Sequence, residues 1–125
     1  AALRERDDAG VRYNLARAYL SANRLPEAEA EYRAVIARGG PVEAANDLGL
    51  VFMRAGRFEE AEKAFLDVSR SHPGFPLTYY NLGVLYESQG KRPLAAQAVR
   101  LWSAASDSPA DKAEADAWLR RLEKR

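Results

Sequence analysis

The sequence predicts an all-α chain built from repeated helical hairpins. Three ten-residue segments are near copies of one another: NLARAYLSAN at 14–23, DLGLVFMRAG at 47–56 and NLGVLYESQG at 81–90. The copies begin 33 and then 34 residues apart, and self-similarity at such a period is the signature of a repeat architecture. The chain of 125 residues is long enough to bury a core without disulfides or metals.

Each copy belongs to a unit of two helices. In the middle unit, Leu48, Gly49 and Phe52 follow a helical period and form one stripe. Thirteen residues after Leu48, a second stripe begins with Ala61 and continues with Phe65. The equivalent positions in the outer units are Leu15, Ala16, Tyr19, Ala28 and Tyr32 in the first, and Leu82, Gly83, Tyr86, Ala95 and Val99 in the third.

Turn-forming residues separate the predicted helices. Asn23, Gly56 and Gly90 end the first helix of each unit, because these residue types tolerate the left-handed conformation that terminates a helix. Proline fits the first turn of a helix, where a missing N–H costs nothing. The prolines expected in first turns are Pro26, Pro41, Pro76, Pro93 and Pro109.

Small residues predict close contact between the two helices of a unit. Helix axes that approach within about 8–10 Å leave little room for side chains at the crossing. Glycine inside a helix is less favourable than alanine by up to about 1 kcal/mol, so its presence at 49 and 83 indicates that close packing outweighs propensity. The residues expected to meet are Ala16 with Ala28, Gly49 with Ala61, and Gly83 with Ala95.

Both ends of the array carry capping signals. Asp8 is a candidate N-cap for the first helix, and Ser108 for a last helix over about 109–124. The last open face of a stacked array must be covered by a helix that is apolar on one side only. We therefore expect Trp102 to pack against this last helix, whose apolar face consists of Ala115, Trp118, Leu119 and Leu122.

These residues resemble the tetratricopeptide repeat, whose pattern is W-x2-L-G-x2-Y, then A-x3-F, then Pro, over 34 residues. The second unit matches most of the pattern and ends on Pro73, and the third has Tyr79 at the tryptophan position. The first unit departs most, with Arg12 for Trp and Gly40 for Pro. The resemblance implies one domain, a right-handed α-solenoid of three hairpins at about 9–41, 42–75 and 76–109 with a seventh, capping helix.

Composition argues against several classes of function. The 19 basic and 18 acidic residues do not cluster by sign, so we expect neither a nucleic-acid surface nor membrane insertion. There is no cysteine, and the single histidine, His72, precedes a proline in a predicted turn. A general-base or metal site would have to be built from carboxylates alone, so we expect no enzyme, no metal and no cofactor. The high alanine content and the excess of arginine over lysine are typical of a GC-rich bacterial genome. The first residue is not Met, which suggests that the chain is part of a larger protein.

The resemblance implies a partner-binding groove on the concave side, which the first helix of every unit lines. An apolar strip with a rim formed by Arg17, Arg54 and Glu87 is typical of a protein-binding surface. Asn14 and Asn81 would be placed to hydrogen-bond an extended peptide. The expected groove residues are Tyr13, Asn14, Arg17, Leu20, Asn46, Leu50, Met53, Arg54, Leu77, Tyr80, Asn81, Val84 and Glu87.

Two functions remain open at this stage. The first is an adaptor that binds a peptide or an amphipathic helix of another protein in the groove. The second is a structural spacer that forms homo-oligomers by self-assembly. The strip could also be covered by flanking parts of the chain. The clamp of Lys, Asn and Arg with which some family members hold a chaperone's C-terminal carboxylate is not expected, since Tyr13, Arg17, Asp47, Leu77 and Asn81 stand at those places.

Overall fold

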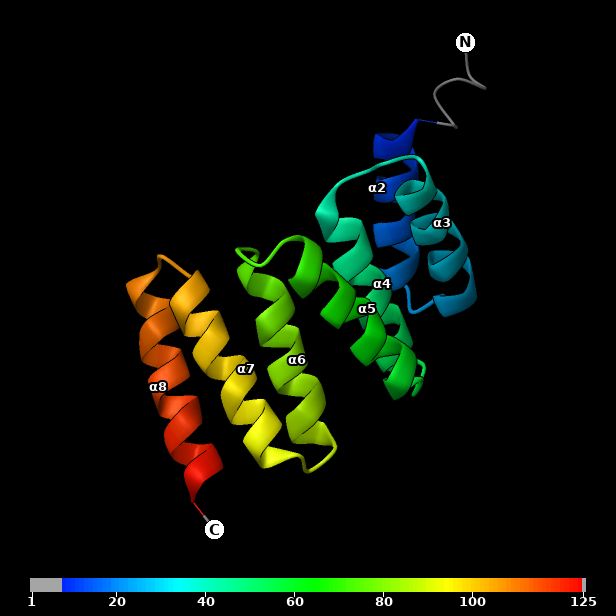
Figure 1. Ribbon diagram of the computed structural model, residues 1–125. Coiled ribbons are helices and arrows are strands. Elements are labelled where there is room, and N and C mark those ends of the chain that lie inside the picture. Colours follow the sequence, from blue (N-terminus) through cyan, green and yellow to red (C-terminus); the bar gives the residue numbers. More distant parts are fainter. Residues whose placement is uncertain (1–7, 125) are drawn as a thin grey trace. The chain divides into compact units, whose positions relative to one another are not determined.

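Helices and short turns make up the chain in this computed structural model, which describes residues 8–124. No strand lies within those residues, and the all-α prediction is confirmed. The helices, labelled in Figure 1, are α2 (Ala9–Ser21), α3 (Leu25–Ala37), α4 (Val42–Arg54), α5 (Phe58–Ser71), α6 (Pro76–Ser88), α7 (Arg92–Ala105) and α8 (Pro109–Glu123).

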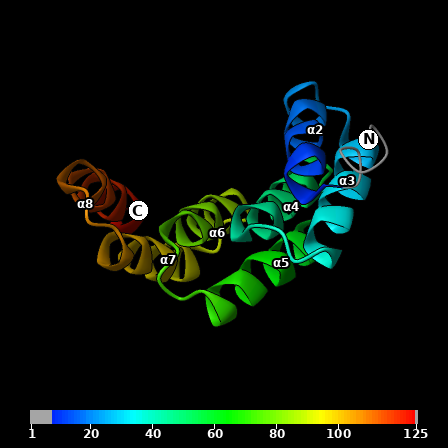
Figure 2. The same ribbon diagram turned by 90° about the horizontal axis from the view of Figure 1, so that it is seen from above.

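The chain divides into two compact units between Ala64 and Phe65, within α5. In the first unit α3 packs against both α2 and α4. In the second unit α7 packs against both α6 and α8, and both views show α7 between these two helices (Figures 1 and 2). Sequential helices therefore lie side by side in each unit, as expected of helical hairpins.

The predicted caps begin the first and the last of these helices. The Asp8 carboxylate accepts hydrogen bonds from the backbone N–H groups of Gly10 at 2.7 Å and Val11 at 3.3 Å. The Ser108 hydroxyl accepts one from the N–H of Asp111 at 3.2 Å. Each cap satisfies N–H groups that have no partner inside the helix.

The turns also follow the prediction, with one difference. Asn23, Gly56 and Gly90 have φ angles of 58°, 76° and 73°, which lie in the left-handed region. Pro41 is the N-cap residue of α4 rather than a first-turn residue. Its fixed φ of −65° suits either position. The other prolines expected in first turns, Pro26, Pro76, Pro93 and Pro109, do lie there.

Equivalent leucines differ in burial along the repeat. Leu48 and Leu82 are 8% and 4% exposed, whereas Leu15 is 41% exposed. Among the described residues, 8–124, no helix precedes α2 and covers the side that carries Leu15. The sequence pattern predicts Leu15 in the same apolar stripe as Leu48 and Leu82, but Leu15 is exposed, because burial of this position requires an adjacent helix.

Gly83 creates room for the last helix of the second unit. A Cβ atom at this position would lie 2.9 Å from Cη2 of Trp118 and 3.2 Å from Cγ2 of Val99. The predicted neighbour, Ala95, is not among the nearest atoms, because the space left by glycine is filled by larger side chains of α7 and α8. Trp102 and Trp118 lie edge to face with ring centroids 6.1 Å apart, which confirms the predicted packing of Trp102 on the last helix.

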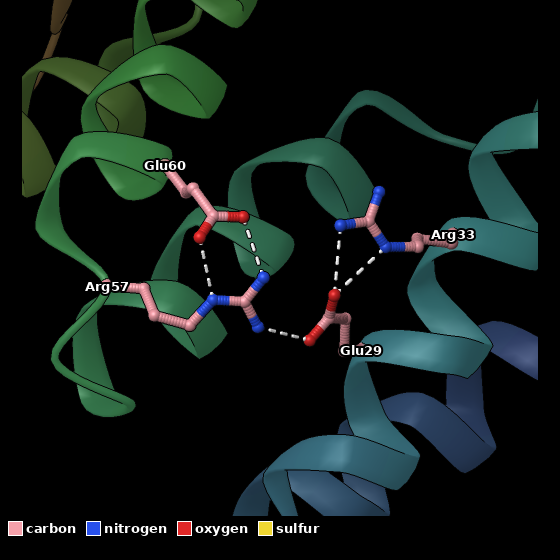
Figure 3. Close-up of polar contacts among 4 residues, drawn as sticks. All are labelled: Glu29, Arg33, Arg57 and Glu60. Carbon is pink, nitrogen blue, oxygen red and sulfur yellow. Dashed lines mark hydrogen bonds and ion pairs between the residues drawn. The ribbon is translucent and has the colours of Figure 1, made fainter.

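A charged network joins α3 to the start of α5 in the first unit (Figure 3). Arg57 donates to Glu29 at 2.6 Å and to both Glu60 oxygens at 2.8 and 2.7 Å. Arg33 donates to the other Glu29 oxygen at 3.1 and 2.9 Å. The guanidinium carbons of Arg57 and Arg33 also lie 4.5 and 5.5 Å from the ring centroid of Phe52. The network thus covers a buried ring and fixes the turn that precedes α5.

Burial alone would raise the pKa of Glu29, but the hydrogen bonds from Arg57 and Arg33 outweigh it and lower the pKa below the ordinary value of 4.5. Folding therefore favours the charged form of this carboxyl group. The contribution to stability is present above the unfolded-state pKa and is lost as the pH falls through the folded-state pKa.

We predict that Gly83→Leu lowers the free energy of unfolding by about 2 kcal/mol or more, because the added side chain would overlap Trp118 and Val99. Urea denaturation followed by circular dichroism measures this loss. Gly74→Leu is the control, since no atom lies within 4 Å of a Cβ there. An equally stable Gly83→Leu variant would contradict the close-packing argument.

We predict that Glu29→Gln lowers the melting temperature by a few degrees at pH 7, where the wild-type carboxylate holds two arginines. The difference should shrink as the pH falls below 4.5, the ordinary pKa of glutamic acid. Thermal unfolding at pH 7 and about pH 3 checks the sign. A difference that is equally large at both pH values would mean that the charge of Glu29 is not responsible.

Candidate functional site

In the first unit, the predicted site residues lie on α2 and α4. Tyr13, Leu50 and Met53 are half-buried, so each still presents part of its side chain to solvent. Asn14 and Arg17 are exposed on α2. These side chains can contact a partner without unfolding of the unit.

Three of the predicted groove residues are buried. Leu20 is 9% exposed, Asn46 is 0% exposed and Asn81 is 6% exposed. Helical period gives the direction of a side chain, but it does not say how closely neighbouring helices approach that side. Asn81 lies on the same face of α6 as the buried Leu85, four residues later. These three side chains are therefore part of the interior and are removed from the candidate surface.

A polar cluster holds Tyr13 in place. The hydroxyl groups of Tyr13 and Tyr32 both donate to Oδ2 of Asp47, at 3.4 and 3.2 Å. The two rings lie edge to face with centroids 6.2 Å apart, and the Arg17 guanidinium carbon is 5.7 Å from the centre of the Tyr13 ring. The contacts fix the ring orientation of Tyr13 while leaving it half-exposed.

Burial raises the pKa of Asp47 above the ordinary value of 3.8, and the hydrogen bonds from Tyr32 and Tyr13 oppose that rise only in part. The same cluster raises the pKa of Tyr32, through burial and through the nearby Asp47 charge. Asp47 and Tyr32 were not predicted as site residues. A signal was available, since Asp47 stands at one of the places where some family members carry their carboxylate clamp.

Arg54, predicted at the rim, has a structural contact as well. Its Nη1 donates to the backbone carbonyl of Leu20 at 3.0 Å. The same carbonyl also accepts the backbone N–H of Asn23 at 3.0 Å, so Arg54 adds a second donor at the end of α2. Arg54 remains exposed overall, but part of its hydrogen-bonding capacity is used inside the unit.

In the second unit, three candidate side chains of α6, those of Tyr80, Val84 and Glu87, adjoin α8. Tyr80 lies edge to face against Trp102, with centroids 5.0 Å apart, and against Trp118, at 5.4 Å. Val84 and Glu87 are half-buried. Leu77 is 44% exposed, so α6 presents both an anchored aromatic ring and an open aliphatic side chain.

Glu87 links α6 to α8. Its carboxylate accepts hydrogen bonds from the indole Nε1–H of Trp118 at 3.0 Å and from Arg121 at 3.2 Å. The sequence predicts Trp118 as a core residue of the last helix, and the structure adds that the polar edge of its ring is part of the site. Arg121 was not predicted there.

The described residues contain few candidates for chemistry. Within residues 8–124 no group of three His, Asp or Glu side chains lies close enough to hold a metal ion. His72 is exposed, with Nδ1 3.1 Å from the Ser71 hydroxyl. None of the helices in this part of the chain has both the length and the apolar character needed to cross a bilayer.

Comparison with known proteins identifies a family and a fold. The sequence pattern of the tetratricopeptide repeat family matches residues 1–44 and 46–110. The crystal structure of PcrH from Pseudomonas aeruginosa superposes with a TM-score of 0.84 at 16% sequence identity, covering 93% of this chain and 92% of PcrH. This likeness shows the helical-repeat fold. A search of curated protein sequences found no match.

We predict that Asp47→Asn does not destabilise the protein at pH 7 and raises its melting temperature. The folded-state pKa of Asp47 is higher than its ordinary value of 3.8, so the fold is favoured with this carboxyl protonated, and that advantage is lost as the pH rises through the folded-state pKa. The neutral amide oxygen can still accept from both tyrosines. Thermal unfolding from pH 3 to pH 7 measures the effect, and a clear loss of stability at pH 7 would contradict it.

Proposed function

Since the chain belongs to the tetratricopeptide repeat family, we propose that it is a non-enzymatic module that holds a peptide or an amphipathic helix of another protein. Repeats of this kind present extended surfaces to partners. The residues we assign to contacts are half-buried and exposed side chains of α2 and α4 in the first unit and, taken separately, of α6 in the second unit.

The observation that carries the proposal is the partial exposure of apolar side chains on these helices. Leu50 and Met53 lie near one another on α4, and each is half-buried. In the second unit, Leu77 is 44% exposed and Val84 is half-buried on α6. Apolar side chains with a polar rim favour binding of a complementary protein surface.

Rigid and adaptable side chains are both available for such contacts. Tyr13 is held by Asp47 and Arg17, so little conformational freedom is lost when it contacts a ligand. Met53 is unbranched and flexible, and residues of this type adjust to varied apolar surfaces. The combination suits an amphipathic segment whose apolar side chains recur at helical spacing.

A second candidate function, self-assembly, is favoured by exposed apolar side chains on α2. Val11 and Leu15 are 46% and 41% exposed on α2. Together with Arg12 and Glu31 they line a shallow hollow of about 320 Å³. A second copy of the chain could cover this edge.

Light scattering over a concentration series tests self-assembly through this edge of α2. A chain that stays monomeric at high concentration would rule it out.

We predict that Leu50→Glu reduces partner capture by the chain at least tenfold, while the melting temperature changes little. A charge placed in an apolar contact costs more than about 1.4 kcal/mol, which corresponds to that factor. Quantitative mass spectrometry of proteins retained on the immobilised chain provides the measurement.

Leu101→Glu is the matched control for that variant. Leu101 is 45% exposed on α7 and lies outside the proposed contact, so the variant should retain the same partner as the wild type. Equal loss with both variants, or unfolding of Leu50→Glu, would count against the proposed surface.

A further inference from the structure

A hollow of about 200 Å³ lies between α6 and α8 in the second unit. Tyr80 and Glu87 line it from α6, and Glu114, Trp118 and Arg121 line it from α8. Pockets for whole small-molecule ligands usually measure about 300–1,000 Å³. The hollow is therefore of a size for one side chain rather than for a cofactor.

The chemistry of the lining favours a cation. Two acidic residues, Glu87 and Glu114, and one arginine, Arg121, line the hollow, which leaves one net negative charge. Within residues 8–124 the carboxylate of Glu114 forms no ion pair or hydrogen bond. The aromatic rings of Tyr80 and Trp118 add surfaces whose faces attract positive charge.

Arg121 already shows how a guanidinium binds here. Its Nη2 lies 3.2 Å from Oε1 and 3.5 Å from Oε2 of Glu87, and its Cζ lies 6.0 Å from the centroid of the Trp118 ring. The arginine side chain is nevertheless 64% exposed. An exposed ion pair of this kind contributes little to stability, so its arginine can be displaced by another one.

We propose that this hollow, defined by Tyr80, Glu87, Glu114, Trp118 and Arg121, is a subsite for an arginine side chain of the bound partner. The inference rests on the proposed function and adds the chemistry of one partner residue. The incoming guanidinium takes the place of Arg121 on Glu87, which accepts its planar N–H groups. Glu114 supplies the second negative charge, and the carbon stem lies against Tyr80 and Val84.

The polar edge of Trp118 provides a direct signal for binding. Its indole N–H donates to Glu87, so a change at that carboxylate shifts the NMR resonance of this N–H group. The chain has only two tryptophans, and their indole signals can be followed separately. The probes are the Nα-acetyl amides of arginine, citrulline, leucine and glutamate, titrated into the full chain.

The expected result is a saturable shift with the arginine probe at millimolar concentration. Citrulline has the same shape without the charge and should bind at least fivefold more weakly. Equal binding of leucine would show that the hollow is an apolar site. Tighter binding of glutamate would show that Arg121 is the recognition group. Either result, or no saturable shift with arginine, would overturn the proposal.

Substitutions on α8 test the two charges separately. Glu114→Gln should weaken binding of the arginine probe at least threefold, whereas Asp116→Asn, an acidic residue of the same helix outside the hollow, should not. Arg121→Gln removes the internal competitor and should tighten binding, and Arg120→Gln is its control. Weaker binding by Arg121→Gln would contradict displacement.

These measurements are independent of partner capture. A chain that binds none of the probes but loses its partner on Leu50→Glu would retain the proposed function and lose this subsite. A chain that binds arginine with the expected ranking but captures no partner would retain the subsite and lose the proposed function.

Discussion

Both units depend on small residues that let larger side chains of the next helix approach. A Cβ atom at position 83 would lie 2.9 Å from the indole of Trp118 and 3.2 Å from a methyl group of Val99, which is closer than ordinary van der Waals contact. Alanine at positions 16, 28, 61, 95 and 115 is fully buried, and a side chain this short permits close helix packing. Packing of this kind fixes which helices meet, and it therefore fixes which side chains remain on the open faces.

Features that are local or periodic could be predicted from the sequence. Features that depend on how closely neighbouring helices approach one another could not. The caps at Asp8 and Ser108 and the left-handed turns follow from residue type at a known position. The burial of Leu20, Asn46 and Asn81 depends on neighbouring helices. So does the participation of α8 in the candidate site, since the sequence assigns this helix only to the core.

Two carboxylates of the first unit show that environment, not residue type, decides the effect of a charge. Glu29 has two arginine partners, and its charged form is favoured. Asp47 has two tyrosine hydroxyls as partners, and burial outweighs them. The first acid contributes to the fold through an ion-pair network. Asp47 orients the Tyr13 ring on the candidate surface, although burial disfavours the charged form of its own carboxyl group.

The unequal burial of the repeat leucines has a dynamic consequence. In an array of repeats each unit is stabilised mainly by its immediate neighbours, and Leu15 is 41% exposed where Leu48 and Leu82 are 8% and 4% exposed. Local opening should therefore begin at α2, and its amide protons should exchange with solvent sooner than those of α4 or α6. Tyr13 and Arg17 lie on α2. The same local opening would let the surface around these two residues change conformation most easily when a ligand binds.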